Sequence, residues 1–260
     1  MSAPPTILLL AGTSEGWEAA EVLSKHPEVR SIASLAGATE TPRPLPIETR
    51  TGGFGGVAGM LEFFANHGVG GVLDATHPFA TQISDNARTA CLRAHLPYAR
   101  IARKLWQQMP GDQWTHVVGL EDALAAIPPG ARAFLALGRK HTQALGARAD
   151  IQIVLRVAES HDDDGALIER LGGAGRVTLI SERPSPDIAT EVALLRAHKV
   201  TLLVARNSGG DRGYAKIAAA RTLSVPVIMI SRPTEVIVET ACAQEITVDA
   251  IPDWLSRLRI

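Results

Sequence analysis

The chain has few cysteines and no excess of basic residues. It contains only 2 cysteines in 260 residues, Cys91 and Cys242. Because they lie far apart in the sequence and inside expected helices or strands, a reducing compartment fits better than a disulfide-stabilised secreted domain. A net charge of -1 means that Lys and Arg are not in excess. The composition therefore argues against nucleic acid or a membrane surface as a partner.

Long apolar runs are also missing. No stretch approaches the length that crosses a bilayer, and the N-terminus, Met1 to Pro5, lacks the basic residues of a signal peptide. We therefore expect a cytoplasmic protein without a membrane span, and we assign no metal site. The length allows one large α/β domain or two small ones, with a substantial core in either case. The oligomeric state is left open.

The chain is instead rich in short aliphatic runs that alternate with helical patterns. The first part predicts strands at 6–10, 30–36, 69–73 and 97–101, helices near 16–25, 57–67 and 79–95, and a loop at 38–56. After a polar segment at 104–114, which we take as a linker, the alternation restarts. The second part predicts strands at 133–137, 151–157, 177–180, 200–205 and 225–230, with helices near 120–126, 140–147, 163–171, 187–198 and 213–222.

Continuous aliphatic strands that alternate with helices are typical of parallel sheets covered on both faces. The predicted fold class is therefore α/β, with two Rossmann-like domains, mainly parallel sheets and a cofactor or substrate cleft between them. We place the domains at residues 1–106 and 107–260. The C-terminal segment 235–260 packs either on the second domain or back on the first.

The first strand-to-helix turn is a candidate nucleotide site. Gly12 allows the backbone to come close to a pyrophosphate, and the amides of Thr13, Ser14 and Glu15 begin a helix with positive potential. The dinucleotide fingerprint is incomplete, because only Gly12 and Gly16 of its glycines are present. An ordinary turn capped by Thr or Ser remains the alternative.

Two further segments bear on the cofactor. After the second strand no acidic residue occurs before Glu40, which favours NADP over NAD, and Arg43 is a candidate for the 2′-phosphate. Residues 52–56 then set Phe54 among four glycines. Gly52, Gly53 and Phe54 suit a close approach to a flat ligand, with the ring available to stack, whereas a flexible hinge explains the glycines equally well.

The segment from Asp74 to Ala80 carries the densest chemistry. A carboxylate, a hydroxyl and an imidazole follow a predicted strand as Asp74, Thr76 and His77. Ligands of open α/β sheets collect at the carboxyl ends of strands. We therefore take Thr76 as a cofactor contact and His77 as a substrate contact. A turn that caps the next helix is the alternative.

Basic and polar residues recur after other strands. They are Arg100 and Arg103, Arg139 and Lys140, and Arg206 with Asn207 and Ser208. If they converge on one cleft, they would bind a polyanionic substrate, since arginine binds carboxylates through two hydrogen bonds.

Several of these segments together resemble one family. Residues 74–80, Ile83-Ser84, Asn86-Ala87 and Arg100–Arg103 with Trp106 are similar to the precorrin-6A reductases of cobalamin biosynthesis. The segments 12–16, 52–56 and 206–210 resemble other motifs of that family. The resemblance runs in order from about residue 6 to Pro233.

The resemblance implies a two-domain reductase that takes NADPH and transfers hydride to precorrin-6A, giving precorrin-6B. His77 is then the candidate proton donor, oriented by Asp74, and the basic residues above are candidates for the acetate and propionate groups of this tetrapyrrole. Ala38 departs from the family, which commonly has an arginine there, so the 2′-phosphate contact is in question. Lys104 replaces a usual proline, and Arg206 a frequent lysine.

Two other classes of function stay open at this point. One is an NADP-dependent reductase of a smaller metabolite, although the chain lacks a Tyr-x-x-x-Lys pair, since residues 102 and 218 are alanines. The other is a nucleotide-sensing module without chemistry. Within the reductase family, cobalt-precorrin-6A is an alternative substrate.

Overall fold

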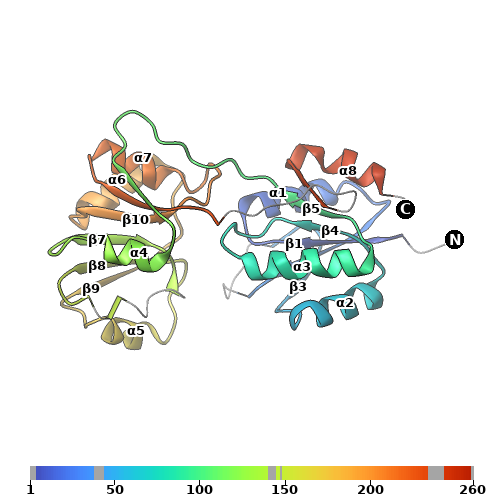
Figure 1. Cartoon of the computed structure of the whole chain (residues 1–260), viewed down its shortest axis with the longest axis horizontal. Coiled ribbons are helices and arrows are strands. Elements are labelled where there is room, and N and C mark those ends of the chain that lie inside the picture. The colour runs from blue at the N-terminus through green and yellow to red at the C-terminus, as the bar shows by residue number, and fades with distance from the viewer. Residues whose placement is uncertain (1–3, 38–43, 140–144, 147, 234–242, 259–260) are drawn as a thin grey trace. The chain divides into compact units, whose positions relative to one another are not determined.

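The computed structural model describes residues 4–37, 44–139, 145–146, 148–233 and 243–258. The chain divides into two compact units, one made of Met1–Arg103 with Thr234–Ile260 and the other of Lys104–Pro233. The second unit thus begins at Lys104, a little before the boundary that we placed after residue 106. Each unit is built on its own sheet of six strands with helices packed on it (Figure 1).

The sheet of the first unit has the strand order of a dinucleotide-binding fold. Its order is β3-β2-β1-β4-β5-β12, and every pair is parallel. This is the Rossmann order 3-2-1-4-5-6, with the C-terminal strand in the sixth place. The strands are β1 (Thr6–Leu10), β2 (Arg30–Leu35), β3 (Glu48–Thr51), β4 (Val69–Asp74), β5 (Tyr98–Ile101) and β12 (Ala243–Ile246).

Helices cover both faces of this sheet (Figure 1). Ile7 and Leu9 of β1 pack in one buried cluster with α1 and α8, whereas Leu8 and Leu10 pack in another with α2 and α3. Because β1 is buried on both faces, its sequence is continuously aliphatic rather than alternating. The helices are α1 (Ser14–Leu23), α2 (Gly56–His67), α3 (Thr81–Ala94), the short 3-10 turn η3 (Val248–Ala250) and α8 (Ile251–Arg257).

The sheet of the second unit repeats this order. It runs β9-β8-β7-β10-β11-β6, again with all pairs parallel. The sixth place is taken by β6, which comes first along this part of the chain. The elements are β6 (Trp114–Val117), α4 (Leu120–Ala125), β7 (Arg132–Ala136), β8 (Gln152–Val157), α5 (Asp164–Arg170), β9 (Val177–Ser181), α6 (Ile188–Ala197), β10 (Leu202–Arg206), α7 (Ala215–Thr222) and β11 (Val227–Ile230).

The predicted loop 38–56 contains β3, so this prediction is wrong there. The predicted linker 104–114 begins at the boundary between the two units and reaches the start of β6, and its Trp106 is buried in the core of the second unit. β3 has the polar sequence Glu-Thr-Arg-Thr and is the edge strand of this sheet, paired on one side with β2 and with no other described strand. An edge strand needs no aliphatic run, so its sequence resembles a loop. The helix expected at 140–147 falls mostly outside the described residues.

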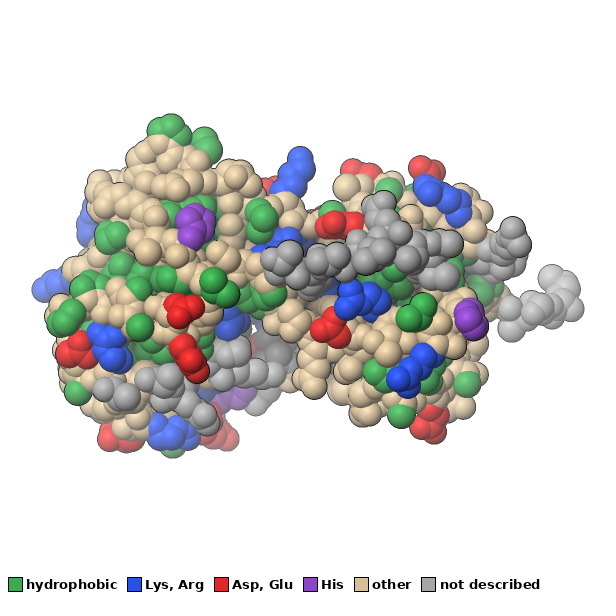
Figure 2. All heavy atoms as spheres, in the orientation of Figure 1, with side chains coloured by type: hydrophobic (Ala, Val, Ile, Leu, Met, Phe, Trp, Pro, Cys, Tyr) green, Lys and Arg blue, Asp and Glu red, His purple; other side chains and the backbone are tan. Residues whose placement is uncertain are grey.

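The surface carries charges of both signs. On the face shown in Figure 2, the coloured Lys and Arg side chains are interspersed with Asp and Glu over both units. None of the helices that the structure describes combines the length and the hydrophobicity of a membrane span.

Candidate functional site

The polar motifs lie where each sheet reverses its strand order. The reversal falls between β1 and β4 in the first unit and between β7 and β10 in the second. Residues 12–15 follow β1, and Arg139 follows β7. Asp74 ends β4 and Arg206 ends β10, and residues 75–79 and 207–208 come directly after them. Ligands of doubly wound sheets bind outside the carboxyl ends of the strands at this reversal. Within each unit, the fold thus brings the motifs together at the carboxyl ends of the strands, where a ligand is expected.

The turn between β1 and α1 is shaped by Thr13 and two glycines. The Thr13 hydroxyl caps α1 by accepting from the Gly16 amide at 3.2 Å, and it donates to the Ala75 carbonyl at 2.8 Å. A Cβ on Gly16 would lie 3.2 to 3.4 Å from Ala11 and Ala75, whereas one on Gly12 would meet nothing within 4 Å. Gly16 therefore allows close helix-to-strand packing, and Gly12 faces open space.

The amides of this turn are available to an anion. Within the described residues, no backbone hydrogen bond uses the amides of Gly12, Thr13 or Ser14 as donors. They lie at the positive end of a helix of 10 residues. A phosphate group at this end would receive hydrogen bonds that the helix itself cannot use.

Glu15 introduces a negative charge at the same helix end, and Arg103 compensates it. Nε of Arg103 lies 2.9 Å from Oε1 of Glu15, and the Ser14 hydroxyl donates to Oε2 of Glu15 at 2.9 Å. The Arg103 side chain is mostly buried, and this burial lowers its pKa while Glu15 acts to raise it. Without this pair, Glu15 would repel an anionic ligand at the turn.

Asp74 lies at the centre of a buried network. Its side chain is fully buried at the end of β4. Oδ1 accepts from the Thr76 amide at 2.9 Å and the Thr76 hydroxyl at 2.7 Å. Oδ2 accepts from the Tyr98 hydroxyl at 2.8 Å and lies 2.5 Å from Nη1 of Arg100. Both carboxylate oxygens are thus bonded within the protein.

Arg100 and Thr76 take part in the same network. Nη1 of Arg100 also donates to the Thr76 hydroxyl at 3.0 Å and to the Ser84 hydroxyl at 2.6 Å. Arg100 is 6% exposed, so its charge is directed at Asp74 and not at solvent. These contacts fix the turn between β4 and α3. Sequence reasoning missed the roles of Tyr98 and Ser84. Ser84 lies in one of the family-like motifs, whereas Tyr98 lies in none of them.

His77 projects from that fixed turn and is half-buried. Its Nδ1 accepts a hydrogen bond from the Phe79 amide at 3.2 Å. A ring nitrogen can accept only when it carries no proton, so this bond selects the neutral ring with its proton on Nε2. His77 is thereby oriented as a hydrogen-bond donor through Nε2.

The glycine-rich loop is held by Arg50. Nη1 and Nη2 of this residue donate to the carbonyls of Gly52 and Gly53, each at 3.0 Å, and its guanidinium lies 4.2 Å from the Phe54 ring centre. A Cβ on Gly59 would come within 1.8 Å of the Phe54 carbonyl oxygen, so α2 can approach the loop only with glycine there. The loop is therefore an ordered structure with a specified path.

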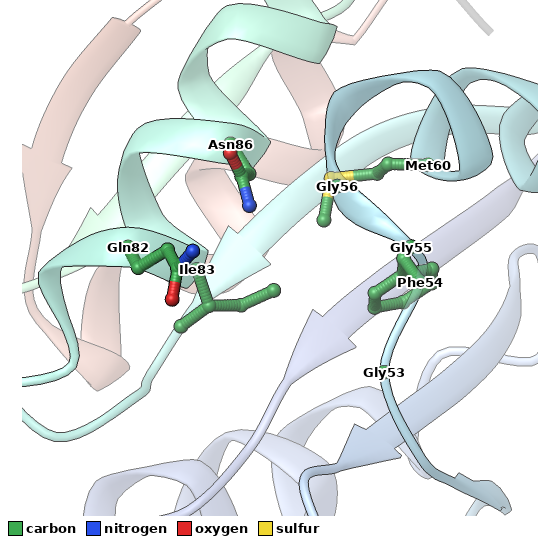
Figure 3. A pocket seen from close by; sticks show the side chains of 8 residues that line it. All are labelled: Gly53, Phe54, Gly55, Gly56, Met60, Gln82, Ile83 and Asn86. Atoms are coloured by element: carbon green, nitrogen blue, oxygen red, sulfur yellow. The ribbon is translucent and has the colours of Figure 1, made fainter.

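A pocket of about 240 Å³ opens beside this loop (Figure 3). The loop and Met60 of α2 form one side, and three residues of α3 face them from the other. The lining residues are Gly53, Phe54, Gly55, Gly56, Met60, Gln82, Ile83 and Asn86. Its mixed apolar and amide lining suits a flat heterocycle with polar edges. Arg43, expected near the same end of the sheet, lies outside the described residues.

In the second unit, Asn207 binds the incoming chain to the end of β10. Its Oδ1 accepts from the Trp106 amide at 3.0 Å, and its Nδ2 donates to the Trp106 carbonyl at 3.0 Å. The indole Nε1 donates to the Gly210 carbonyl at 2.7 Å. Asn207 is buried, so its amide completes the backbone of residue 106 as a neighbouring strand would.

Replacing Asn207 with alanine is expected to destabilise the second unit by about 1–3 kcal/mol, because the buried N–H and C=O of Trp106 lose their partners. The measurement is the free energy of chemical unfolding followed by near-ultraviolet circular dichroism, with Ser208→Ala as the control. An equal, small change in both variants would show that the Asn207 amide does not stabilise this segment.

The other predicted site residues of the second unit differ in their contacts and burial. Arg139 pairs with Asp163 at 3.3 Å and with Asp164, so it joins the β7 loop to the start of α5. Arg206 is half-buried, and this burial lowers its pKa. Ser208 is half-buried, and its carbonyl accepts from Arg232 at 3.1 Å. Lys140 lies outside the described residues.

These features define an α/β protein of two Rossmann-like units with a nucleotide-type turn at the first sheet. A profile of the precorrin-6x reductase CbiJ/CobK family matches residues 6–256. The chain belongs to this family. It is therefore a reductase of cobalamin biosynthesis that acts on a macrocycle, and its enzyme class implies a nicotinamide cofactor.

The chain is similar to known precorrin-6A reductases over almost its whole length. The precorrin-6A reductase of Rhodobacter capsulatus is 36% identical over 251 residues, which cover 96% of this chain and 95% of that protein. The precorrin-6A reductase of Rhodococcus erythropolis is 39% identical over 229 residues, covering 87% and 89%. A solved structure of CobK precorrin-6A reductase superposes with a TM-score of 0.87 at 36% identity, covering 98% and 97%. The predicted α/β fold with two mainly parallel sheets and the predicted family are confirmed, and the two other classes of function are set aside.

Proposed function

We propose that this chain reduces precorrin-6A to precorrin-6B with NADPH as the hydride donor. The observation that carries the proposal is the turn between β1 and α1. It stands at the strand-order reversal of a Rossmann-ordered sheet, in a chain that belongs to the precorrin-6x reductase family. The open space at Gly12 and the available amides fit the pyrophosphate of a dinucleotide.

The cofactor side of the site would use the backbone more than side chains. The amides of Gly12, Thr13, Ser14 and Glu15 would hold the pyrophosphate, while Thr13 keeps the turn in shape and Arg103 neutralises Glu15. The pocket beside Phe54 would take the adenine ring. NADPH supplies the hydride when bound, and the protein supplies position and electrostatics.

On the reaction side, the proposal gives His77 the direct role and its neighbours a positioning role. Nε2 of His77 would donate a hydrogen bond to the macrocycle and stabilise charge that develops during reduction, as a neutral imidazole can. Asp74, Thr76 and Arg100 would hold the His77 turn in place through their buried network. The proton that accompanies the hydride would come from solvent, because the neutral ring of His77 keeps its own proton.

Substrate carboxylates need cations with exposed donors. We assign the acetate and propionate groups to Arg206 and Ser208 at the end of β10, with Lys140 as a further candidate, because arginine and lysine bind carboxylates strongly. Asn207 and Arg139 would fix the loops that carry these residues. Arg103, expected beside the substrate from the sequence, is assigned instead to the cofactor turn through Glu15.

The test is turnover of metal-free precorrin-6A by the purified full chain. With NADPH we expect cofactor oxidation together with a product heavier by two hydrogens, measured by mass spectrometry. Parallel reactions with NADH and with cobalt-precorrin-6A define the cofactor and the form of the substrate. Turnover of the cobalt form alone would move the proposal to that substrate, and no turnover of either form would contradict it.

A further inference from the structure

Arg50 joins the ends of β2 and β3 to the glycine-rich loop. It lies near the carboxyl end of β3, and its register partner is Ser34 near the carboxyl end of β2. Nη1 donates to the Ser34 hydroxyl at 2.7 Å and to the Gly52 carbonyl at 3.0 Å, and Nη2 donates to the Gly53 carbonyl at 3.0 Å. All three acceptors are uncharged.

This arginine differs from others of the first unit. Arg30 pairs with Glu48, Arg100 with Asp74 and Arg103 with Glu15. Within the described residues, Arg50 forms no ion pair, although it is half-buried and burial lowers its pKa. A partly desolvated cation is unfavourable without a counter-charge. An anionic ligand at this position would supply one.

The place of Arg50 in the fold identifies the anion. In Rossmann folds that bind NAD, an acidic residue after the second strand binds the ribose 2′-hydroxyl, whereas a nearby arginine accommodates the 2′-phosphate of NADP. Here the second strand carries Ser34 near that end, and Arg50 is bonded to it. The guanidinium therefore lies beside the carboxyl end of β2, where the adenosine ribose is expected.

The hydrogen-bond inventory leaves room for a phosphate. A guanidinium has five N–H donors, and the three bonds above leave donors on Nε and Nη2. Arg30 uses these same two nitrogens to bind the Glu48 carboxylate from the side. A phosphate would fit the same paired geometry.

We propose that Arg50 binds the 2′-phosphate of the nicotinamide cofactor and sets a preference for NADPH over NADH. Gly53 and Phe54 support this assignment, because both contact Arg50 and both line the pocket in which we place the adenine (Figure 3). The inference rests on the proposed function, and it identifies which side chain would bind the 2′-phosphate.

The experiment compares dissociation constants for NADPH and NADH in the native chain and in variants, measured by calorimetry. Arg50→Met should weaken NADPH binding by about 10- to 100-fold more than it weakens NADH binding, the usual effect of losing hydrogen bonds to a charged group, since any loosening of the glycine-rich loop affects both dinucleotides alike. Arg50→Lys should fall between. The matched control is Arg30→Met, an exposed arginine on β2, the same strand as Ser34, at the opposite end from the proposed site. It should alter neither constant.

Different failures have different meanings. An equal loss of NADPH and NADH affinity in Arg50→Met would show that Arg50 only holds the loop, and a loss of preference in Arg43→Met alone would move the phosphate to that residue. If Arg50→Met does not fold, the native chain still decides: equal affinity for adenosine 2′,5′-bisphosphate and adenosine 5′-monophosphate would overturn the inference. A native chain that binds neither dinucleotide would remove the proposed function itself.

Discussion

Replacing Arg100 with methionine is expected to lower the stability of the first unit by about 3–5 kcal/mol, since it leaves a buried carboxylate without its cationic partner. Asp74 is fully buried and its Oδ2 lies 2.5 Å from Nη1 of Arg100. The Tyr98 and Thr76 hydroxyls would still donate to Asp74, but neither carries a charge. The measurement is amide hydrogen exchange in β4 and β5, which reports the opening of this unit separately from the other.

Two controls separate the buried pair from a general effect of losing an arginine. Arg88 pairs with Asp85 at 2.8 Å on the exposed side of α3, so Arg88→Met should change stability by less than about 1 kcal/mol. The double variant Arg100→Met with Asp74→Asn removes both charges and should be more stable than Arg100→Met alone. An Arg100→Met protein that resembles Arg88→Met would contradict the role of the network.

The central strands could be predicted from the sequence because burial on both faces requires aliphatic residues throughout. β1 was predicted with the bounds that the structure gives it, and β4 differs only by the added Asp74. The three strands that were missed, β3, β6 and β12, all lie at the edges of the two sheets. Each has four residues, and none is buried throughout, so no continuous aliphatic run marks them.

The position of the candidate motifs at strand ends was predictable, whereas the partners of their side chains were not. β1 and β4 are neighbouring parallel strands, so the segments at their carboxyl ends lie close together. The motifs at Gly12 and Asp74 could therefore be assigned to a common site. Sequence order does not show that Asp74 and Arg100 face each other across neighbouring strands. Through that contact Asp74, expected to orient His77, and Arg100, expected to bind substrate, form a buried structural pair.

Arg50 is a second residue whose partner could not be predicted from the sequence. While β3 is read as part of a loop, Arg50 has no defined neighbour. Once β3 is recognised as a strand, its register with β2 places Arg50 opposite Ser34. Because β3 was not predicted, Arg50 was not recognised as a candidate cofactor-binding residue, although it lies next to the glycine-rich loop.

Replacing His77 with alanine is expected to lower kcat by about 10²–10³-fold, the effect of removing one hydrogen-bond donor that stabilises developing charge. The dissociation constant for NADPH should not change, because the proposal places the cofactor on the turn after β1 and on the loop after β3. His77→Asn keeps a side-chain donor and should recover part of the rate. The matched control is His95→Ala, an exposed histidine at the far end of α3.

The pH dependence of kcat distinguishes the two chemical roles of this ring. Nδ1 accepts from the Phe79 amide, so the ring donates from Nε2 while it is neutral. A neutral donor keeps that proton as the pH rises, and kcat should not fall between about pH 7 and 9 on account of His77. A protonated imidazole acting as a general acid would give a falling limb that disappears in His77→Asn. A raised Michaelis constant with unchanged kcat in His77→Ala would assign the residue to substrate binding alone, because such a change removes an interaction made equally in the ground state and the transition state.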